Sequence, residues 1–317
     1  VIFVKQSVLV DQWKRSIADF APHKKVVEIV SKKPFDEDAD VYILNPIILK
    51  KDCDPKKFSK IKLLIVDELH QIVTKILCRA FFGFRVDYVV GLSATPYRPV
   101  GDPMGIAIEW FFGNKKVGTT LFRKHAVRCI QTNFCPKSTY NKFTKKLDWN
   151  HVLTQQASDE DRNDIIVDAV TDRPDKIWLV LVKRVEHAKT LKKMFAAKGF
   201  KSETMTGADK TFDKECKILI GTTSKVGVGF DHAPINALCM AADVVEYFEQ
   251  FLGRCMRRKE VEPIVVDFDD PYKPLKRHLF KRLNKYEIHG GVVEYQKSEE
   301  EDQTPKISIP SRKKKNF

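Results

Sequence analysis

The first 95 or so residues alternate between short apolar runs and longer stretches in which apolar residues recur with a helical period. Apolar runs of this length are typical of strands buried on both faces, as in a parallel sheet. Ser7 can cap a helix in which Leu9 and Trp13 lie one turn apart. The predicted strands are Val1–Val4, Val26–Val30, Val41–Leu44, Leu63–Val66 and Tyr88–Val90, with further helices over Ile47–Lys50 and from Gln71. This βαβ alternation predicts a doubly wound parallel sheet.

The same alternation resumes near residue 176. The predicted strands there are Ile177–Val182, Lys217–Ile220, Asn236–Met240 and Pro263–Val266, and the predicted helices start near Val185 and cover Asp243–Arg258. A chain of 317 residues is long enough for two cores. We therefore predict an α/β fold with two tandem parallel-sheet domains, residues 1–130 and 176–270.

The intervening residues lack a clear period. Gly101–Arg123 is rich in glycine and aromatic residues, and we expect a loop with a hairpin there. Gln131–Asn150 is polar and rich in lysine, whereas Asp159–Val170 is predicted to be a helix. We expect residues 131–175 to connect the two domains.

The end of the chain is strongly charged. Leu275, Leu279 and Leu283 predict an amphipathic helix whose other faces are basic, followed by a hairpin around Gly290 and Gly291, so that residues 271–297 form an extension. Residues 298–317 contain an acidic and then a basic run, a composition typical of a disordered tail.

The net charge of +14 favours a polyanionic partner, most simply nucleic acid, over a membrane surface. No apolar run reaches the length of a membrane span. The seven cysteines are dispersed without C-x-x-C pairs, which argues against a zinc site and favours reduced thiols in an intracellular compartment.

The first candidate site follows the strand Leu63–Val66, where the chain reads D-E-L-H. Ligands of open α/β sheets collect beyond the carboxyl ends of the strands. Asp67 is placed there to hold a hydrated Mg²⁺, and Glu68 to orient an attacking water. Ser93 and Thr95 follow the next strand in G-L-S-A-T-P and offer two hydroxyls at the same edge. Taken alone, each piece is better explained as an ordinary polar turn.

The second candidate site lies in the second domain. Residues 222–231 read T-T-S-K-V-G-V-G-F-D, in which hydroxyls and glycines suit phosphate oxygens. Residues 250–257 read Q-F-L-G-R-C-M-R, and three-residue spacing predicts that Arg254 and Arg257 share a helix face. Two guanidiniums on one face can clamp a γ-phosphate, although an exposed basic face is the simpler interpretation.

In this order the pieces resemble a helicase of the second superfamily. The resemblance covers residues 1 to about 288 and rests on V-I-F-V-K-Q-S-V-L-V-D-Q-W, D-E-L-H, G-L-S-A-T-P-Y-R, I-W-L-V-L-V-K-R-V-E-H-A, T-T-S-K-V-G-V-G-F-D and Q-F-L-G-R-C-M-R-R. The residues of these motifs are most similar to those of DNA-repair and transcription-type helicases, including the helicases of large DNA viruses. The resemblance implies two RecA-like domains with an inter-domain cleft for Mg²⁺ and ATP.

The resemblance also implies a role for each matching residue. Asp67 and Glu68 would serve Mg²⁺ and water, and His70 would couple the γ-phosphate to the other domain. Ser93 and Thr95 would transmit closure. Gln250, Arg254 and Arg257 would reach ATP, with Gly229 and Asp231 near the ribose. The nucleic-acid groove would be formed by Lys5, Gln12, Asn45, Thr222 and Thr223.

One element of the family pattern is missing from this sequence. The phosphate loop G-x-x-x-x-G-K-[ST] precedes the first of these motifs in the family, and the chain begins at that motif. Residues 113–120, G-N-K-K-V-G-T-T, have a threonine where the lysine is required and are interpreted as a turn. We expect that the chain is truncated before the loop, and that this chain by itself binds ATP poorly.

The sequence therefore predicts an ATP-dependent helicase or translocase, with DNA favoured over RNA as its substrate. Two alternatives remain open. One is an ATP-driven translocase that remodels DNA–protein complexes without separating strands, and the other is a nonenzymatic nucleic-acid-binding remnant. The expected location is the nucleus or, for a viral protein, a cytoplasmic viral factory or the virion. The sequence leaves the oligomeric state open.

Overall fold

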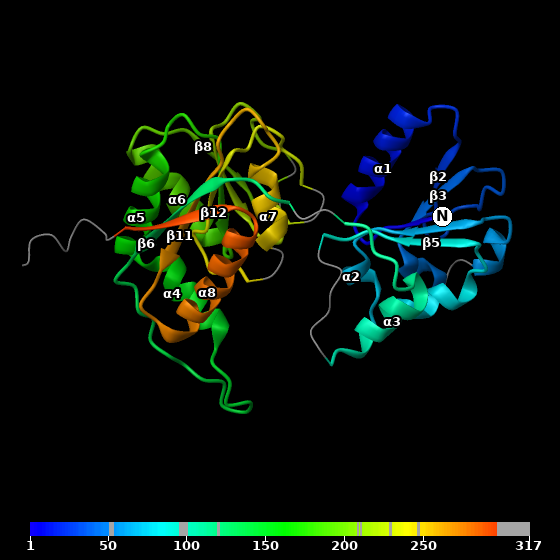
Figure 1. The fold of residues 1–317 in the computed structure, drawn as a ribbon, viewed down its shortest axis with the longest axis horizontal. Coiled ribbons are helices and arrows are strands. Elements are labelled where there is room, and N and C mark those ends of the chain that lie inside the picture. The colour runs from blue at the N-terminus through cyan, green and yellow to red at the C-terminus, as the bar shows by residue number, and fades with distance from the viewer. Residues whose placement is uncertain are drawn as a thin grey trace, which may run out of the picture. The chain divides into compact units, whose positions relative to one another are not determined.

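A computed structural model describes residues 1–50, 54–94, 101–118, 121–207, 209, 211–227, 230–245 and 248–296, with the side chains of residues 50 and 79 left aside. Thr95, Gly229 and the predicted tail at 298–317 lie outside these residues. The chain divides into two compact units, Val1–Thr120 with Val226–Asp231, and Leu121–Lys225 with His232–Phe317 (Figure 1). Within the described residues, no helix is long and apolar enough to cross a membrane.

The first unit is built on a parallel sheet of five strands in the order β2-β3-β1-β4-β5. Its strands are β1 (Ile2–Phe3), β2 (Val26–Glu28), β3 (Val41–Leu44), β4 (Leu63–Val66) and β5 (Tyr88–Gly91). Its helices are α1 (Ser7–Phe20), α2 (Leu69–Ile72), α3 (Pro103–Phe112) and the 3₁₀ helices η1 (Pro46–Lys50), η2 (Pro55–Phe58) and η3 (Cys78–Gly83).

Both faces of this sheet are covered, as its unbroken apolar strands predict. Val1 and Phe3 of the β1 segment belong to one core cluster, which also contains the strand residues Leu44 and Val66. Ile2 and Val4 belong to a second cluster together with Leu9 and Val10 of α1. Alternate residues of one strand thus enter cores on opposite faces of the sheet.

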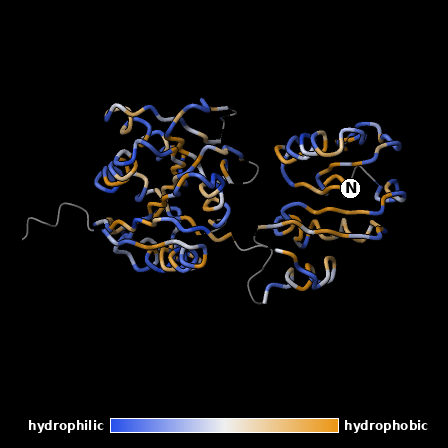
Figure 2. Tube along the Cα trace, turned by 45° about the horizontal axis from the view of Figure 1, so that its top comes forward, coloured by the Kyte–Doolittle hydropathy of each residue, from blue (hydrophilic) through white to orange (hydrophobic). Residues whose placement is uncertain are grey.

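The second unit contains a parallel sheet of seven strands in the order β12-β6-β11-β10-β7-β9-β8. Its strands are β6 (His125–Gln131), β7 (Trp178–Val182), β8 (Ser202–Met205), β9 (Ile218–Thr222), β10 (Ala237–Cys239), β11 (Ile264–Asp269) and β12 (Gly291–Gln296). Its helices are α4 (Trp149–Ser158), α5 (Glu160–Thr171), α6 (Val185–Ala197), α7 (Phe248–Cys255) and α8 (Lys273–Ile288). In both units the hydrophobic positions concentrate along the strands (Figure 2). The expected α/β fold with two parallel sheets is confirmed.

Three local expectations differ from the structure. The predicted loop and hairpin at Gly101–Arg123 contains α3, which begins at Pro103 after Asp102 caps the backbone N–H of Met104. Residues 121–130, which the sequence places in the first domain, belong to the second unit, where β6 pairs with β11 and β12. The expected hairpin after residue 285 is also wrong. Helix α8 continues to Ile288, and β12 then pairs in parallel with β6.

The expected connection over residues 131–175 is largely a part of the second unit. Helices α4 and α5 occupy its second half, and the α5 residues Ile166, Val167 and Val170 are buried in the main core of that unit. The polar composition of residues 131–150 suggested a linker, because the apolar residues that pack against the second sheet lie mainly in the helices that follow.

Candidate functional site

The carboxyl end of β4 places two adjacent acidic residues at the edge of the first sheet. The Asp67 backbone N–H donates to the Phe3 carbonyl (3.0 Å), which extends the pairing between β1 and β4 by one residue. Glu68 then adopts a left-handed backbone conformation with φ +49°, an uncommon one for a residue other than glycine. The Asp67 carboxylate supports this turn because its Oδ1 accepts a hydrogen bond from the Glu68 backbone N–H (2.9 Å).

The other oxygen of Asp67 is held by a tryptophan. Trp13 Nε1–H, on α1, donates to Asp67 Oδ2 at 2.8 Å. Each carboxylate oxygen can accept more than one hydrogen bond, so both oxygens of Asp67 keep capacity for a hydrated metal ion. The described residues contain no group of three or more His, Cys, Asp or Glu side chains with metal-binding geometry. A hydrated Mg²⁺ needs only one or two carboxylates beside water and phosphate oxygens, and the Asp67 carboxylate fits that chemistry.

His70 joins this edge to the end of the neighbouring strand. Its Nδ1 lies 2.8 Å from Ser93 Oγ and 3.3 Å from Glu68 Oε2. Ser93 follows β5, and the Leu69 backbone N–H donates to the Leu92 carbonyl (2.9 Å), which keeps the two segments together. The structure thus brings Asp67, Glu68, His70 and Ser93 into one cluster at the carboxyl ends of two paired strands.

A glycine at the end of β5 allows this close approach. A Cβ on Gly91 would lie 2.6 Å from Leu69 Cδ2 and 2.9 Å from Phe112 Cδ1. Any larger residue would require the Leu69 and Phe112 side chains to move. Gly91 therefore allows the side chains of α2 and α3 to pack directly against the end of β5.

In the second unit, Gln250 and Arg254 lie on α7. Arg254 is buried, with its guanidinium 5.4 Å from the centre of the Phe251 ring. Gln250 is half-buried, and its Nε2 has no hydrogen-bond partner among the described residues. A buried amide without a partner is costly, which makes Gln250 Nε2 a candidate donor to a ligand.

The three-residue spacing predicts that Arg254 and Arg257 share a helix face. This prediction is wrong. Helix α7 ends at Cys255, and Arg257 is exposed beyond it. The cause is Arg123, whose Nη1 donates to the carbonyls of Met256 (2.8 Å) and Arg258 (2.5 Å), while its Nη2 donates to that of Lys259 (3.1 Å). These bonds hold the segment in a non-helical turn. Sequence reasoning missed Arg123, which carries no local signal.

The predicted nucleic-acid residues fall into separate groups. Asn45 Nδ2–H donates to the Lys5 carbonyl (2.9 Å), and Asn45 Oδ1 accepts from the Ile47 N–H (3.0 Å), so Asn45 fixes the backbone beside the exposed Lys5. Gln12 is half-buried on α1. Thr222 ends β9 and is buried, and its hydroxyl has no partner among the described residues. The neighbouring Thr223 N–H donates to the Val182 carbonyl (2.9 Å), and Asp231 is exposed.

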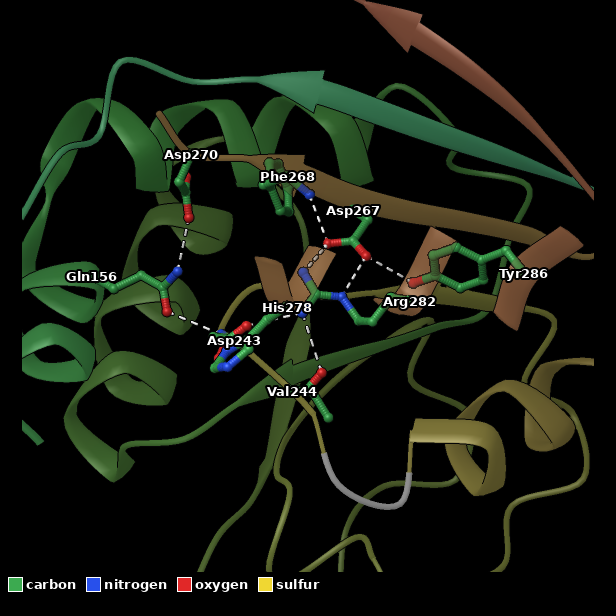
Figure 3. A network of polar contacts seen from close by, with 9 residues as sticks. All are labelled: Gln156, Asp243, Val244, Asp267, Phe268, Asp270, His278, Arg282 and Tyr286. Carbon is green, nitrogen blue, oxygen red and sulfur yellow. Dashed lines mark hydrogen bonds and ion pairs between the residues drawn. The ribbon is translucent and has the colours of Figure 1, made fainter. Parts of the chain in front are cut away.

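Sequence reasoning also missed a buried polar network in the second unit (Figure 3). Arg282 of α8 donates two hydrogen bonds to the Asp267 carboxylate (2.7 and 2.9 Å) and a third to Asp243 (2.9 Å). Tyr286 Oη–H donates to Asp267 (2.9 Å), and His278 Nδ1 lies 2.7 Å from Asp243 Oδ2. Burial raises the pKa of Asp243, but the bonds to His278 and Arg282 outweigh it and hold that pKa below its usual range.

A neighbouring part of the network contains Asp270, the residue that follows β11. Arg162 Nε donates to Asp270 Oδ1 (2.9 Å), and Gln156 Nε2–H donates to Asp270 Oδ2 (2.9 Å). The sequence does contain a signal for these acids, because Asp267, Asp269 and Asp270 follow a short apolar run just as Asp67 and Glu68 do. Here Asp267 and Asp270 bind Arg282 and Arg162 of the same unit, and these ion pairs connect α8 and α5 to the sheet.

The geometry defines an α/β protein of RecA-like type, with a D-E-L-H strand end in its first sheet. The model of a family described as “Type III restriction enzyme, res subunit” matches residues 1–98. “Putative helicase 161L” of Invertebrate iridescent virus 6 is 36% identical over 319 aligned residues, which cover 92% of this chain and 71% of the relative. “Putative helicase 055L” of Frog virus 3 is 33% identical over 297, covering 92% and 68%.

The chain therefore belongs to the superfamily 2 helicases, in the family that these viral proteins represent, which confirms the resemblance expected from the sequence. Solved structures agree on the fold. S. cerevisiae Dbp5 bound to RNA and ADP BeF3 gives a TM-score of 0.60 at 14% identity, covering 95% of this chain and 78% of that one. Mycobacterium smegmatis Lhr bound to ssDNA and AMP-PNP gives 0.52 at 16%, covering 85% and 39%.

Proposed function

We propose that this chain forms part of an ATP-dependent helicase or translocase that acts on nucleic acid, with DNA favoured over RNA. The observation that carries the proposal is the cluster of Asp67, Glu68, His70 and Ser93 at the carboxyl ends of β4 and β5. It lies within residues 1–98, the part that matches the restriction-enzyme family model. The net charge of +14 and the family membership support a nucleic-acid substrate.

The chemistry proposed for the cluster follows from its contacts. A magnesium ion bound there would offset the charge that develops on the transferred phosphoryl group. Trp13 and the turn at Glu68 hold the Asp67 carboxylate in a fixed orientation, and in that orientation it would hold the ion through hydrogen bonds from its bound water. Glu68 lies beside it as an acceptor for a proton of the attacking water. His70, in contact with Ser93, would link this edge to the end of β5.

We further propose that Gln250, Arg254 and Arg257 contact the triphosphate, with Gly229 and Asp231 near the ribose. Arg254 is already ordered by burial against Phe251, whereas Arg257 is exposed and positioned through Arg123. Lys5, Gln12, Asn45, Thr222 and Thr223 remain the proposed contacts to nucleic acid. Thr222 and Thr223 stand at the carboxyl end of β9, the edge at which ligands of parallel sheets bind.

The test is Glu68→Gln in the gene product that contains this chain. The amide keeps the shape of the side chain but cannot accept a proton, so we expect ATP hydrolysis to fall by at least about 10²-fold, a typical share for a general base. Nucleotide binding, measured with a fluorescent ATP analogue, should be unchanged. Glu37→Gln is the matched control, because Glu37 is exposed in the same unit. Hydrolysis by Glu68→Gln at the rate of the control would refute the proposal.

A further inference from the structure

The outer face of α8 combines cations with an exposed aromatic ring. Leu275, Leu279, Leu283 and Tyr286 on its inner face are buried. Lys273, Arg277 and Lys281 recur every four residues on the outer face, and Phe280 beside them is 65% exposed. Together with Pro271 and Lys276 they line an open depression of about 570 Å³. An exposed phenylalanine in such a depression is available to contact a flat apolar partner.

The charge of this face is not balanced within the second unit. Lys276 pairs with Asp269 (3.3 Å), and Lys285 pairs with Glu249 (2.5 Å). Lys273, Arg277 and Lys281, by contrast, have no acidic partner among the described residues. Three neighbouring cations without acids repel one another, and an anionic ligand would relieve that repulsion.

A projecting loop over residues 139–147 repeats the same composition. Tyr140 and Leu147 form its base through an antiparallel bridge, and Asn141 Oδ1 accepts hydrogen bonds from the N–H groups of Phe143 and Thr144 (both 2.9 Å). Phe143 is 94% exposed at its tip. The loop also carries the exposed cations Lys142, Lys145 and Lys146.

The base of the loop contacts the beginning of α8. Ser138 Oγ lies 2.7 Å from Tyr272 Oη, immediately before α8, and Leu147 packs with Leu275 in one small core cluster. The loop projects beyond α4 and α8 in Figure 1. We name this combined region the basic–aromatic surface, and define it by Lys142, Phe143, Lys145, Lys146, Lys273, Arg277, Phe280 and Lys281.

We propose that the basic–aromatic surface binds single-stranded nucleic acid, as a contact additional to the groove residues of the proposed function, on which this inference rests. Exposed aromatic rings stack on unpaired bases, which a duplex does not offer, while lysine and arginine bind the backbone phosphates. The surface is separate from Thr222 and Thr223. Helix α8 packs against β11 and β12, and β11 is three strands from β9, about 14 Å at ~4.8 Å per strand.

The experiment measures binding of a fluorescein-labelled dT20 oligonucleotide to the full 317-residue chain by anisotropy at several salt concentrations. Phe143→Ala with Phe280→Ala should weaken binding by about fivefold or more per ring. Lys273→Gln with Arg277→Gln and Lys281→Gln should lower the slope of log affinity against log salt by about 2, at ~0.7 per phosphate contact. A duplex of equal length should be affected much less by the loss of the rings.

Matched controls separate this surface from general charge and apolarity. Phe20→Ala removes a 90% exposed ring from the first unit, and Lys33→Gln with Lys60→Gln and Lys115→Gln removes the same charge there. Circular-dichroism melting confirms that each variant is folded. Surface variants that bind dT20 like their controls would overturn the inference and leave the proposed function standing. Binding of poly-glutamate is measured in parallel. Surface variants that lose poly-glutamate binding but keep dT20 binding would assign the surface to an acidic protein partner, and this result would also overturn the inference.

Failure of the proposed function gives a different result. In that case the wild-type chain would bind neither dT20 nor the duplex at low salt. Groove variants at Thr222 and Thr223 would then also have no effect, whereas failure of the inference alone leaves wild-type binding and its groove dependence intact.

Discussion

Asp267 of β11 and Arg282 of α8 form a two-point ion pair, with Nε–Oδ2 and Nη2–Oδ1 distances of 2.7 and 2.9 Å, in which both side chains are buried. Fork-shaped guanidinium binding of this kind fixes orientation as well as distance. Burial opposes the charge on Arg282, but Asp267 and Asp243 outweigh it and raise the pKa of Arg282 further above its ordinary value. The pair fixes the rotation of α8 and hence the direction of its basic outer face.

We expect Arg282→Met to lower the free energy of unfolding by about 3–5 kcal/mol, because Asp267 and Asp243 would be left buried without their cation. Urea denaturation followed by tryptophan fluorescence measures this change. Arg277→Met, five residues earlier and on the exposed face of the same helix, should change stability by no more than about 0.5 kcal/mol. Equal effects of the two substitutions would show that the ion pair does not anchor the helix.

His187 predicts a pH dependence of stability. Its Nε2–H donates to Asn163 Oδ1 (2.8 Å), and burial, with the nearby Arg162, lowers its pKa to about 3. The unfolded chain binds a proton at this residue below pH about 6.5, whereas the folded chain does not. Stability is therefore lost as the pH falls from 6.5 toward 3, at up to about 1.4 kcal/mol per pH unit.

Urea midpoints measured between pH 7 and 5 test this dependence. His187→Gln should remove most of the slope that the histidine contributes, whatever its effect at pH 7. His23→Gln, at an exposed position, should leave the slope unchanged. A wild-type midpoint that does not move over this range would contradict the prediction.

Trp13→Phe should loosen the Asp67 carboxylate, because it removes the donor at 2.8 Å while keeping an aromatic ring against the sheet. Losing a hydrogen bond to a metal-binding carboxylate typically costs tenfold or more in metal affinity. We expect the Mg²⁺ concentration for half-maximal ATP hydrolysis by the gene product to rise by about that factor. Trp110→Phe, where the ring is 81% exposed, is the control. An unchanged Mg²⁺ requirement would mean that Trp13 only packs.

Ser93→Ala should separate hydrolysis from movement. The substitution removes the hydroxyl that contacts His70 Nδ1 but leaves Asp67 and Glu68 unchanged. We expect ATP hydrolysis within a few-fold of wild type and a clear drop in the number of base pairs opened per ATP, measured by strand displacement alongside phosphate release. Ser16→Ala, on the exposed side of α1, should affect neither. A parallel loss of both activities would place Ser93 in the chemistry itself.

Much of the fold followed from local pattern. Val180 and Val66 lie in unbroken apolar runs, and both are fully buried in parallel strands, as such runs predict. The cluster of Asp67, Glu68, His70 and Ser93 was also predictable, because paired parallel strands end at the same edge. Helix α3 was missed although Asp102 and Pro103 are a standard helix start, since nearby glycines and aromatic residues suggested a loop.

Other features depended on partners remote in the chain. The amphipathic residues of β12 do not indicate that their partner is β6, 166 residues earlier at the Gly291–His125 pair. Arg257 left the helix face because Arg123, more than 130 residues away, binds the carbonyls of the turn. Asp267 and Asp243 had the same local signal as catalytic acids, and only the position of Arg282 made them structural.

The sequence by itself determined which segments are strands, that the sheets are parallel, and which acids follow a strand. These features depend only on local order: an unbroken apolar run indicates burial on both faces, and strands that alternate with helices run in parallel. The tertiary structure decided which of those acids are neutralised by a buried arginine and which keep capacity for a ligand. That difference depends on the distance between groups far apart in the chain, and only the folded packing sets such distances.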